Sequence, residues 1–308
     1  MISKSFYSHG KLLITGEYLV LDGALALALP TQKGQSLSVE HSKESGIFWE
    51  SMDHLGKYWF RANLTYSQLE NFNFKITSTP SIQDRLIQIL IEAKKLNPQF
   101  LKEESGILVK TKLDFSQNWG LGSSSTLIAN VAKWAQIDAF KLLENTFGGS
   151  GYDIACAQND SPLLYQLVDN KPHVLLTTFE KPFLDQLFFI HLNRKQNSRD
   201  SIKHYREQTQ NNIKEASKKI SGLTESILNS NSLNGLNMLL DAHETLLSSI
   251  LKTPTIKSRM FSDYSGSIKS LGGWGGDFIL ATGSVEDMQY FNKKGFSTIV
   301  PFSEMVLN

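Results

Sequence analysis

The sequence of 308 residues contains one cysteine, Cys156, and carries a formal net charge of only +1 at pH 7. A single cysteine excludes an internal disulfide and any metal site built from several cysteines. The seven histidines show no His-Glu-x-x-His or related spacing, so a zinc site is not expected. The small net charge provides no electrostatic argument for binding to nucleic acid or to a membrane surface.

Long apolar segments are also missing. The most apolar early run, residues 18–30, is interrupted by Asp22 and is too short to span a bilayer. The N-terminal residues lack the apolar core of a signal peptide. With 41% hydrophobic and 20% charged residues, the composition is typical of a soluble globular protein, and the length allows two modest domains. We therefore expect a cytoplasmic protein.

A glycine- and serine-rich stretch precedes an apolar run with helical spacing. The stretch consists of Gly120, Leu121, Gly122, Ser123, Ser124 and Ser125. Its glycines permit a tight turn and a close approach of the backbone to a ligand, and the free N–H groups and dipole of a following helix favour an anion. It is not a Walker A loop, since no Gly-Lys-Ser/Thr follows, and the third glycine of a Rossmann fingerprint is missing. The stretch predicts a phosphate-binding loop, and a simple turn with a helix cap is the alternative.

The first half of the chain has several predicted strands before its first long helix, which argues against a doubly wound α/β fold. Short apolar runs bounded by turn residues predict strands at residues 11–14, 18–21, 24–29, 35–40, 47–49 and 58–61. Helical spacing predicts a helix over residues 81–95 with Ser81 as its cap, and alternation predicts a strand over residues 106–113. A further helix with a break is expected from about residue 126 to residue 145.

The second half of the chain differs in composition. We place the boundary between two domains near residue 180, which gives residues 1–180 and residues 181–308. A compact strand is expected over residues 187–192, and the following residues are strongly helical. A strand over residues 278–281 and an edge strand over residues 298–302 are expected near the end of the chain.

Three glycine-bearing segments resemble, in the same order, the three motifs of the GHMP small-molecule kinases, a family that includes galactokinase, homoserine kinase, mevalonate kinase and phosphomevalonate kinase. The segments are residues 10–18, 120–125 and 272–277. The resemblance therefore spans most of the chain. It implies an α+β fold with two domains, an N-terminal ATP-binding domain like the second domain of ribosomal protein S5 and a ferredoxin-like C-terminal domain.

Two details resemble the mevalonate and phosphomevalonate kinases in particular. Glu17-Tyr18 is the form of the first motif associated with phosphomevalonate kinases, and residues 149–153 resemble the segment that carries the catalytic aspartate in both groups. The resemblance implies an enzyme that uses ATP and Mg²⁺. It would transfer the γ-phosphate to a hydroxyl or phosphate of mevalonate or phosphomevalonate, in isoprenoid precursor synthesis.

The resemblance also implies roles for individual residues. Asp153 is the expected catalytic base, and Lys11 would keep that carboxylate ionised and stabilise charge on the acceptor oxygen. Residues 120–125 would hold the ATP phosphates, and Ser124 and Glu144 are the expected Mg²⁺ ligands. Glu17 is expected to orient Lys11. The residues expected at the substrate are Glu17, Tyr18, Ser150, Gly151, Gly273 and Asp277.

The sequence leaves several alternatives open. Asp153 could cap a helix that starts at Ile154, and Lys11 could be a solvated side chain. Trp119 and Trp274 stand at unusual places in the glycine motifs and indicate a modified pocket. The alternative functions are a diphosphomevalonate decarboxylase and a non-catalytic, nucleotide-binding regulatory paralogue. The expected partner is a small-molecule acceptor, not nucleic acid or a membrane, and a homodimer is one option for the oligomeric state.

Overall fold

The computed structural model of the chain describes residues 4–72, 80–102, 105–194, 198–208, 212–274 and 276–307. The chain divides into two compact units that interleave along the sequence. Unit 1 comprises Met1–Gly10, Lys33–Gln117 and Gly122–Gln158, and unit 2 comprises Lys11–Gln32, Asn118–Leu121 and Asn159–Asn308. The division into residues 1–180 and 181–308 stays a prediction.

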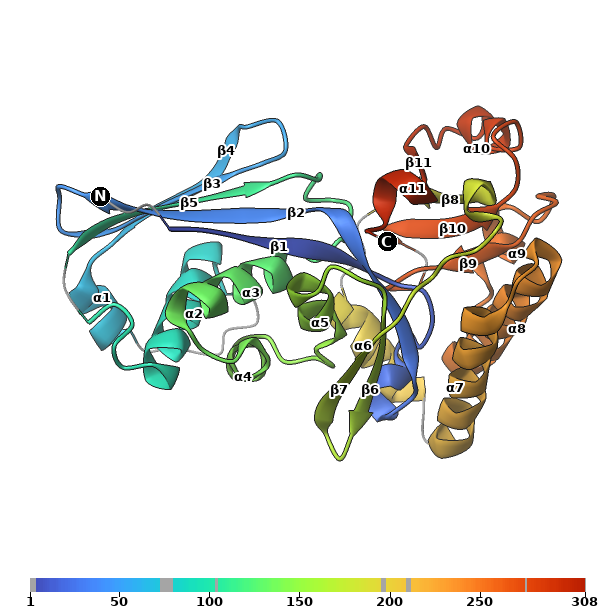
Figure 1. Cartoon of the computed structure of the whole chain (residues 1–308), viewed down its shortest axis with the longest axis horizontal. Helices are drawn as coiled ribbons and strands as arrows, with labels where there is room; N and C mark the ends of the chain where they lie inside the picture. Colours follow the sequence, from blue (N-terminus) through green and yellow to red (C-terminus); the bar gives the residue numbers. More distant parts are fainter. Residues whose placement is uncertain are drawn as a thin grey trace. The chain divides into compact units, whose positions relative to one another are not determined.

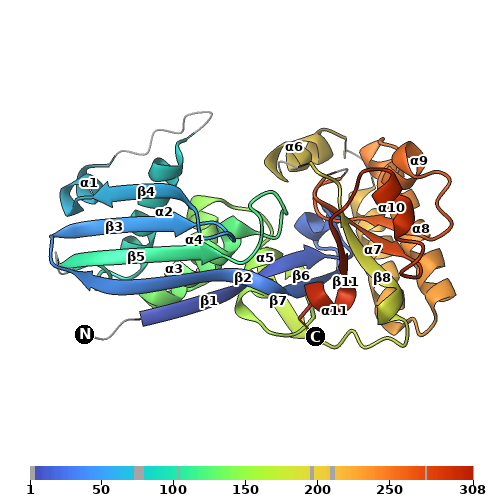
Figure 2. The same ribbon diagram turned by 90° about the horizontal axis from the view of Figure 1, so that it is seen from above.

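Unit 1 contains most of a mixed β-sheet. Its strands are β1 (Lys4–Leu13), β2 (Ala26–Ser42), β3 (Gly46–Met52), β4 (Tyr58–Leu64) and β5 (Gly106–Leu113), of which β1 and β2 continue in sequence into unit 2. β3 lies between β4, which is antiparallel to it, and β5, which is parallel to it (Figure 2). β5 pairs antiparallel with β2, so that Val39 faces Val109, and both side chains are buried. The predicted strand over residues 106–113 is confirmed.

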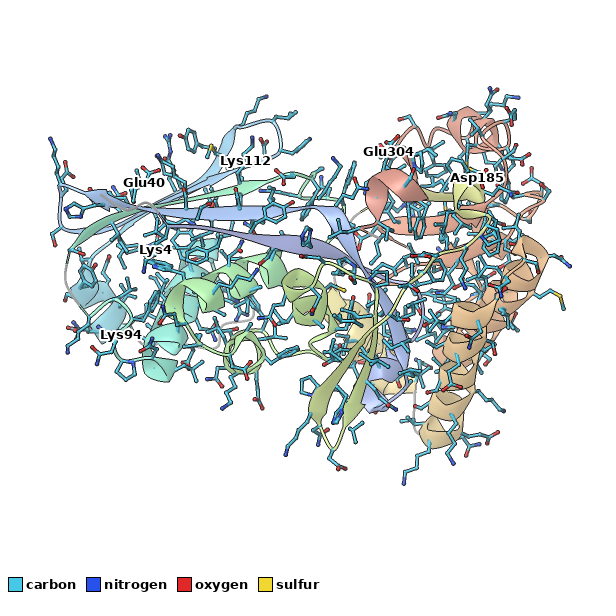
Figure 3. All side chains as sticks on the ribbon, in the orientation of Figure 1. Lys4, Glu40, Lys94, Lys112, Asp185 and Glu304 are labelled. Carbon is cyan, nitrogen blue, oxygen red and sulfur yellow. The ribbon has the colours of Figure 1, made fainter. Side chains whose placement is uncertain are left out.

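The helices of unit 1 cover one face of this sheet (Figure 1). They are α1 (Tyr66–Asn71), α2 (Ile82–Leu96), α3 (Ser123–Ala135), α4 (Ala139–Thr146) and α5 (Tyr152–Gln158). α2 begins where predicted, because Ser81 and Asp84 form a reciprocal capping box. Its buried Leu86 and Leu90 join the core between sheet and helices. The opposite face of the sheet carries polar side chains such as Glu40 and Lys112 (Figure 3).

Unit 2 begins with a segment that differs from the prediction. A strand over residues 18–21 was expected, and this is wrong: Leu19–Asp22 is a short 3-10 helix, η1. The reason is the turn before it, where Gly16 and Tyr18 have φ of 89° and 62°, in the left-handed region that no strand allows. The following residues form the start of β2, which pairs with β6 (Leu163–Val168), and β6 pairs with β7 (Lys171–Leu176).

A second, four-stranded sheet forms the centre of unit 2, with the strand order β11-β8-β10-β9. Its strands are β8 (Leu187–His191), β9 (Ile268–Ser270), β10 (Phe278–Thr282) and β11 (Ile299–Pro301). The structure confirms the strand predicted over residues 278–281 and the edge position of the last strand. The remaining elements are η2 (Leu184–Gln186), α6 (Ser198–Gln208), α7 (Ile213–Asn229), α8 (Leu233–Leu251), α9 (Ile256–Met260), α10 (Gln289–Lys293) and α11 (Phe302–Met305).

Two long helices of unit 2, α7 and α8, pack against each other. α8 buries a stripe of leucines, including Leu240 and Leu247, as the helical spacing of the sequence indicates. The mixture of sheets and helices confirms the predicted α+β class. Over the described ranges, no helix combines the length and the apolar character that crossing a bilayer requires.

Candidate active site

The predicted phosphate loop leads directly into a helix, as its sequence indicates. α3 begins at Ser123, and its N-cap residue is Gly122, with φ of 90°. Because glycine has no side chain, Gly122 offers no capping oxygen to the first N–H groups of the helix. These N–H groups and the positive end of the helix dipole make this terminus suited to an anion.

The start of α3 is held to the sheet of unit 1 by buried polar contacts. The Asn130 side chain donates to the main-chain oxygen of Gln35 at 2.8 Å and accepts from the Ser8 hydroxyl at 2.9 Å. The Thr126 hydroxyl donates to the Gln35 side chain at 2.7 Å. All these groups are buried, so the bonds fix the helix without competition from water.

In unit 2, the second and third glycine motifs meet. Gly120 has φ of 65°, and a Cβ atom built there would lie 2.3 Å from Cγ and Oδ2 of Asp277. Asp277 is held by its own main chain, since its N–H donates to the Arg194 carbonyl at 2.9 Å and its carbonyl accepts from Leu192 N–H at 2.8 Å. Any side chain at position 120 would therefore have to displace the Asp277 carboxylate or the loop itself. The carboxylate of Asp277, in the third motif, thus packs directly against the start of the predicted phosphate loop.

Lys11 lies beside the same loops. Its main-chain N–H donates to the Leu121 carbonyl at 3.0 Å. Its Nζ atom lies 3.9 Å from the position that a Cβ atom would take at Gly272, which has φ of 67°. Gly273, the next residue, accepts the Gly276 N–H at 3.3 Å within the same glycine-rich loop. Unit 2 thus brings Lys11, the start of the phosphate loop and the third motif together.

The two unusual tryptophans pack against the body of unit 2. The Trp119 ring meets Phe278 edge to face at 5.4 Å, and His191 Nε2 lies 3.0 Å from the carbonyl of Asn118, the preceding residue. The Trp274 ring is buried in a core cluster with Tyr18 and Leu247. Both tryptophan side chains thus pack on hydrophobic partners beside the glycine motifs, and the modified pocket stays a prediction.

Three further predicted site residues, Ser150, Gly151 and Asp153, belong to unit 1. Asp153 is in the first turn of α5, which packs against α3, and its carboxylate accepts the N–H of Ile154 at 3.0 Å. Because α5 begins at Tyr152, Asp153 lies within the helix, and this bond is a local contact of its first turn. Ser150 and Gly151 precede α5, and Gly151 has φ of 88°. Because Lys11 and Asp153 belong to different units, their proximity stays a prediction.

The two expected Mg²⁺ ligands are both exposed. Ser124 lies in the first turn of α3, and Glu144 lies on α4. In the part of the chain that the structure describes, no three His, Cys, Asp or Glu side chains form a cluster that could hold a metal ion.

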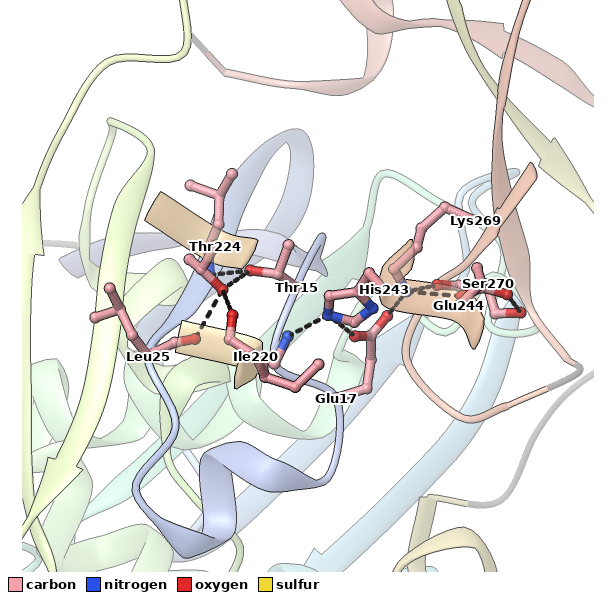
Figure 4. A network of polar contacts seen from close by, with 11 residues as sticks. Thr15, Glu17, Leu25, Ile220, Thr224, His243, Glu244, Lys269 and Ser270 are labelled. Carbon is pink, nitrogen blue, oxygen red and sulfur yellow. Dashed lines mark hydrogen bonds and ion pairs between the residues drawn. The ribbon is translucent and has the colours of Figure 1, made fainter. Parts of the chain in front are cut away.

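Glu17 and Tyr18 point into unit 2, and neither is at the surface. Glu17 is 2% exposed and forms an ion pair with Lys269, which is completely buried (Figure 4). The Tyr18 hydroxyl accepts the main-chain N–H of Trp274 at 2.8 Å. His243 of α8 also belongs to this network. Sequence reasoning missed Lys269 and His243, and the only signal was the place of Lys269 three residues before the glycine loop.

The electrostatics of this network follow from its burial. Burial raises the pKa of Glu17 to about 7, against the opposing effect of the Lys269 charge. Burial also raises the pKa of Glu244, the second carboxylate beside Lys269. The pKa of His243 is lowered well below its ordinary value, first by burial and then by the Lys269 charge, so its imidazole is neutral.

The described fold is that of the GHMP kinases. No protein-family model and no curated protein sequence matches the chain. Its structure is similar to that of the mevalonate kinase of Methanococcus jannaschii, with a TM-score of 0.72, 16% identity and 97% of each chain covered. It is also similar to the Streptococcus pneumoniae phosphomevalonate kinase, solved with phosphomevalonate and AMPPNP (TM-score 0.68, 15% identity, 97% of this chain and 99% of that one).

A solved mevalonate diphosphate decarboxylase, from Legionella pneumophila, has the same fold at a lower TM-score of 0.57, with 13% identity, 97% of this chain and all of that chain covered. The likeness thus confirms the predicted two-domain kinase fold.

Proposed function

We propose that this protein is an ATP-dependent kinase that phosphorylates a small acceptor, mevalonate or phosphomevalonate. The observation that carries the proposal is the meeting of the two glycine motifs at Gly120 and Asp277, with the Lys11 ammonium beside Gly272. Three segments far apart in sequence form one compact arrangement there, as a phosphate site made of loop backbone requires. The GHMP kinase fold supports the same function.

The phosphates of ATP would bind along the loop of Gly120, Leu121, Gly122, Ser123, Ser124 and Ser125. Gly122 has no side chain to accept hydrogen bonds from the N–H groups at the start of α3, so these groups can donate to the phosphates. The helix dipole adds to their attraction for negative charge. Such preorganised donors stabilise charge that develops on the transferred phosphoryl group.

Mg²⁺ fits the residues available, because a serine hydroxyl and a carboxylate are hard oxygen ligands. Ser124 and Glu144 would hold the ion together with the phosphates. Both side chains are exposed, so an ion that enters from solvent can contact them directly. When bound, the ion supplies positive charge that offsets the negative charge of the transferred group.

Asp153 and Lys11 are proposed to act on the acceptor. With mevalonate, the acceptor hydroxyl attacks the γ-phosphorus, its proton passes to the Asp153 carboxylate, and the bond to the bridging oxygen of ADP breaks. With phosphomevalonate, the attacking phosphate oxygen is already ionised and no base is needed. Lys11 would stabilise the acceptor oxygen in either case. Ser150, Gly151, Gly273 and Asp277 would line the acceptor site through their loops.

An assay of ADP release with purified protein, ATP and Mg²⁺ tests the proposal. Mevalonate, phosphomevalonate, diphosphomevalonate, galactose and homoserine would each be supplied as acceptor. Release of ADP with one of the first two, without CO₂, is the expected result. CO₂ together with ADP from diphosphomevalonate would identify a decarboxylase. Tight binding of ATP with no turnover of any acceptor would identify a non-catalytic relative and overturn the proposal.

A further inference from the structure

The turn of residues 15–18 is held by contacts to three distant parts of unit 2. The Gly16 N–H donates to His243 Nε2 of α8 at 3.2 Å, and Glu17 pairs with Lys269 of β9. The Tyr18 hydroxyl accepts from Trp274 in the glycine-rich loop. Each partner lies more than 220 residues later in the sequence. Three consecutive residues of the first motif thus contact α8, β9 and the glycine-rich loop, and Figure 4 shows the contact between Glu17 and Lys269.

The centre of these contacts is the ammonium of Lys269. It lies between two buried carboxylates, Glu17 and Glu244, with its Nζ atom 3.1 Å from Glu244 Oε1. It also donates to the main-chain oxygen of Ser270, whose hydroxyl donates to Glu244 at 3.0 Å. A buried ammonium needs such partners, because water cannot replace them. Its position is therefore determined by both carboxylates.

The two carboxylates differ in what they connect. Glu244 belongs to α8 and holds Lys269 to a helix of the unit's body. Glu17 lies six residues after Lys11, and Lys269 lies three residues before Gly272. The Glu17–Lys269 pair is therefore an ionic contact that joins the segment carrying Lys11 to the strand leading into the glycine loop.

We infer that Glu17 is a positioning residue that fixes the glycine-rich loop beside Lys11 through its ion pair with Lys269, in place of contacting the substrate itself. Only the kinetic consequence of this inference rests on the proposed function. A side chain that is 2% exposed presents almost no surface to a ligand. Its bond to Lys269, together with the Tyr18–Trp274 bond, restrains the loop at its start and in its middle.

The matched pair of variants Glu17→Met and Glu244→Met tests the inference. Each removes one buried carboxylate from the same ammonium and replaces it with an unbranched apolar side chain of similar length. If the network only balances charge, the two variants behave alike. If Glu17 positions the loop, its loss releases residues 271–274 more than the loss of Glu244 does. Glu17→Gln keeps an oxygen that accepts from Lys269 and serves as the conservative rescue.

Hydrogen–deuterium exchange of the free protein is the first readout, and it does not depend on any activity. We expect Glu17→Met to accelerate exchange of the amides of residues 271–274 by about tenfold or more, and Glu244→Met by less than about threefold. Glu17→Gln is expected to stay close to the unchanged protein. Equal acceleration in the two Met variants, or none in Glu17→Met, would overturn the inference.

The second readout is kinetic. Glu17→Met should raise the KM for ATP by about tenfold with a smaller change in kcat, and Glu17→Gln should restore it. If Glu17→Met does not fold, the double variant Glu17→Gln/Lys269→Met removes the pair without leaving the buried ammonium, and it should show the same rapid exchange. Slow exchange in that variant would overturn the inference. A protein without kinase activity but with the expected exchange pattern would refute only the proposed function.

Discussion

Replacing Gly120 by alanine should disable the phosphate loop, because two separate penalties coincide at this residue. Its φ of 65° is in the left-handed region, where a residue with a Cβ atom costs about 1–2 kcal/mol. The added Cβ would also lie 2.3 Å from Cγ and Oδ2 of Asp277. Ordinary van der Waals contact begins at 3.4 Å. Relieving this overlap must displace a carboxylate or the loop, at about 1–3 kcal/mol.

Gly148 provides a matched control for this substitution. Its φ of 66° is nearly the same as that of Gly120, but a Cβ atom there would meet nothing within 4 Å. Gly148→Ala therefore carries the backbone penalty alone. The difference in free energy between the two variants isolates the conflict with Asp277, which we expect to cost about 2 kcal/mol. If ATP binding requires the undistorted loop, this free energy corresponds to a roughly thirtyfold loss of ATP affinity.

Titration with a fluorescent ATP analogue measures the affinity, and thermal unfolding measures the stability of each variant. Asp277→Ala should remove most of the extra penalty of Gly120→Ala in a double-mutant cycle, since the clashing carboxylate is then absent. Equal affinities of the Gly120→Ala and Gly148→Ala variants would refute the reasoning. So would a penalty that persists unchanged in the Asp277→Ala background.

Three further predictions concern the base, the buried carboxylate and the start of α3. Asp153→Asn should lower kcat on mevalonate by about 10²- to 10⁴-fold with ATP affinity retained; full activity would remove the proposed base. Burial raises the pKa of Glu17 from 4.5 to about 7, so between these pH values the folded protein holds a proton that the unfolded chain releases. The stability of the protein should therefore fall as the pH rises from 4.5 to about 7, and then level off. Chemical denaturation at several pH values should show that the free energy of unfolding falls by about 3 kcal/mol over this range, and by less in Glu17→Gln. The same pH dependence of the unfolding free energy in both proteins would contradict this prediction. Asn130→Ala removes a partner from the buried main-chain oxygen of Gln35 and from the buried hydroxyl of Ser8, so it should destabilise the protein by about 2 kcal/mol. A change in the free energy of unfolding below about 0.5 kcal/mol would contradict this prediction.

The sequence by itself determined the elements whose causes are local. The start of α2 follows from Ser81 and Asp84, which satisfy each other's main-chain N–H groups within one turn. The predicted phosphate loop runs into α3 because Gly122 adopts a left-handed conformation just before residues with helical spacing. The alternation of residues 106–113 likewise sufficed for β5. The order of the three glycine segments also predicted the fold, which the solved structures confirm.

Only the tertiary structure decided features that depend on distant partners. Residues 18–21 are apolar enough for a strand, yet they form a 3-10 helix because the preceding turn is bonded to His243, Lys269 and Trp274. The predicted strands over residues 24–29 and 35–40 merge into one long strand, since both halves find pairing partners, β6 and β5.

The same holds for the charged core of unit 2. Nothing in the local sequence marks Lys269 or Glu244 as buried, because the free energy of a buried charge is set by its partners and these come from separate elements. The close approach of Gly120 to Asp277 likewise depends on two segments that are distant in sequence. Hydrogen bonds within one turn can be inferred from neighbouring residues, whereas the pairing of buried charges and the space beside a glycine exist only after the chain has folded.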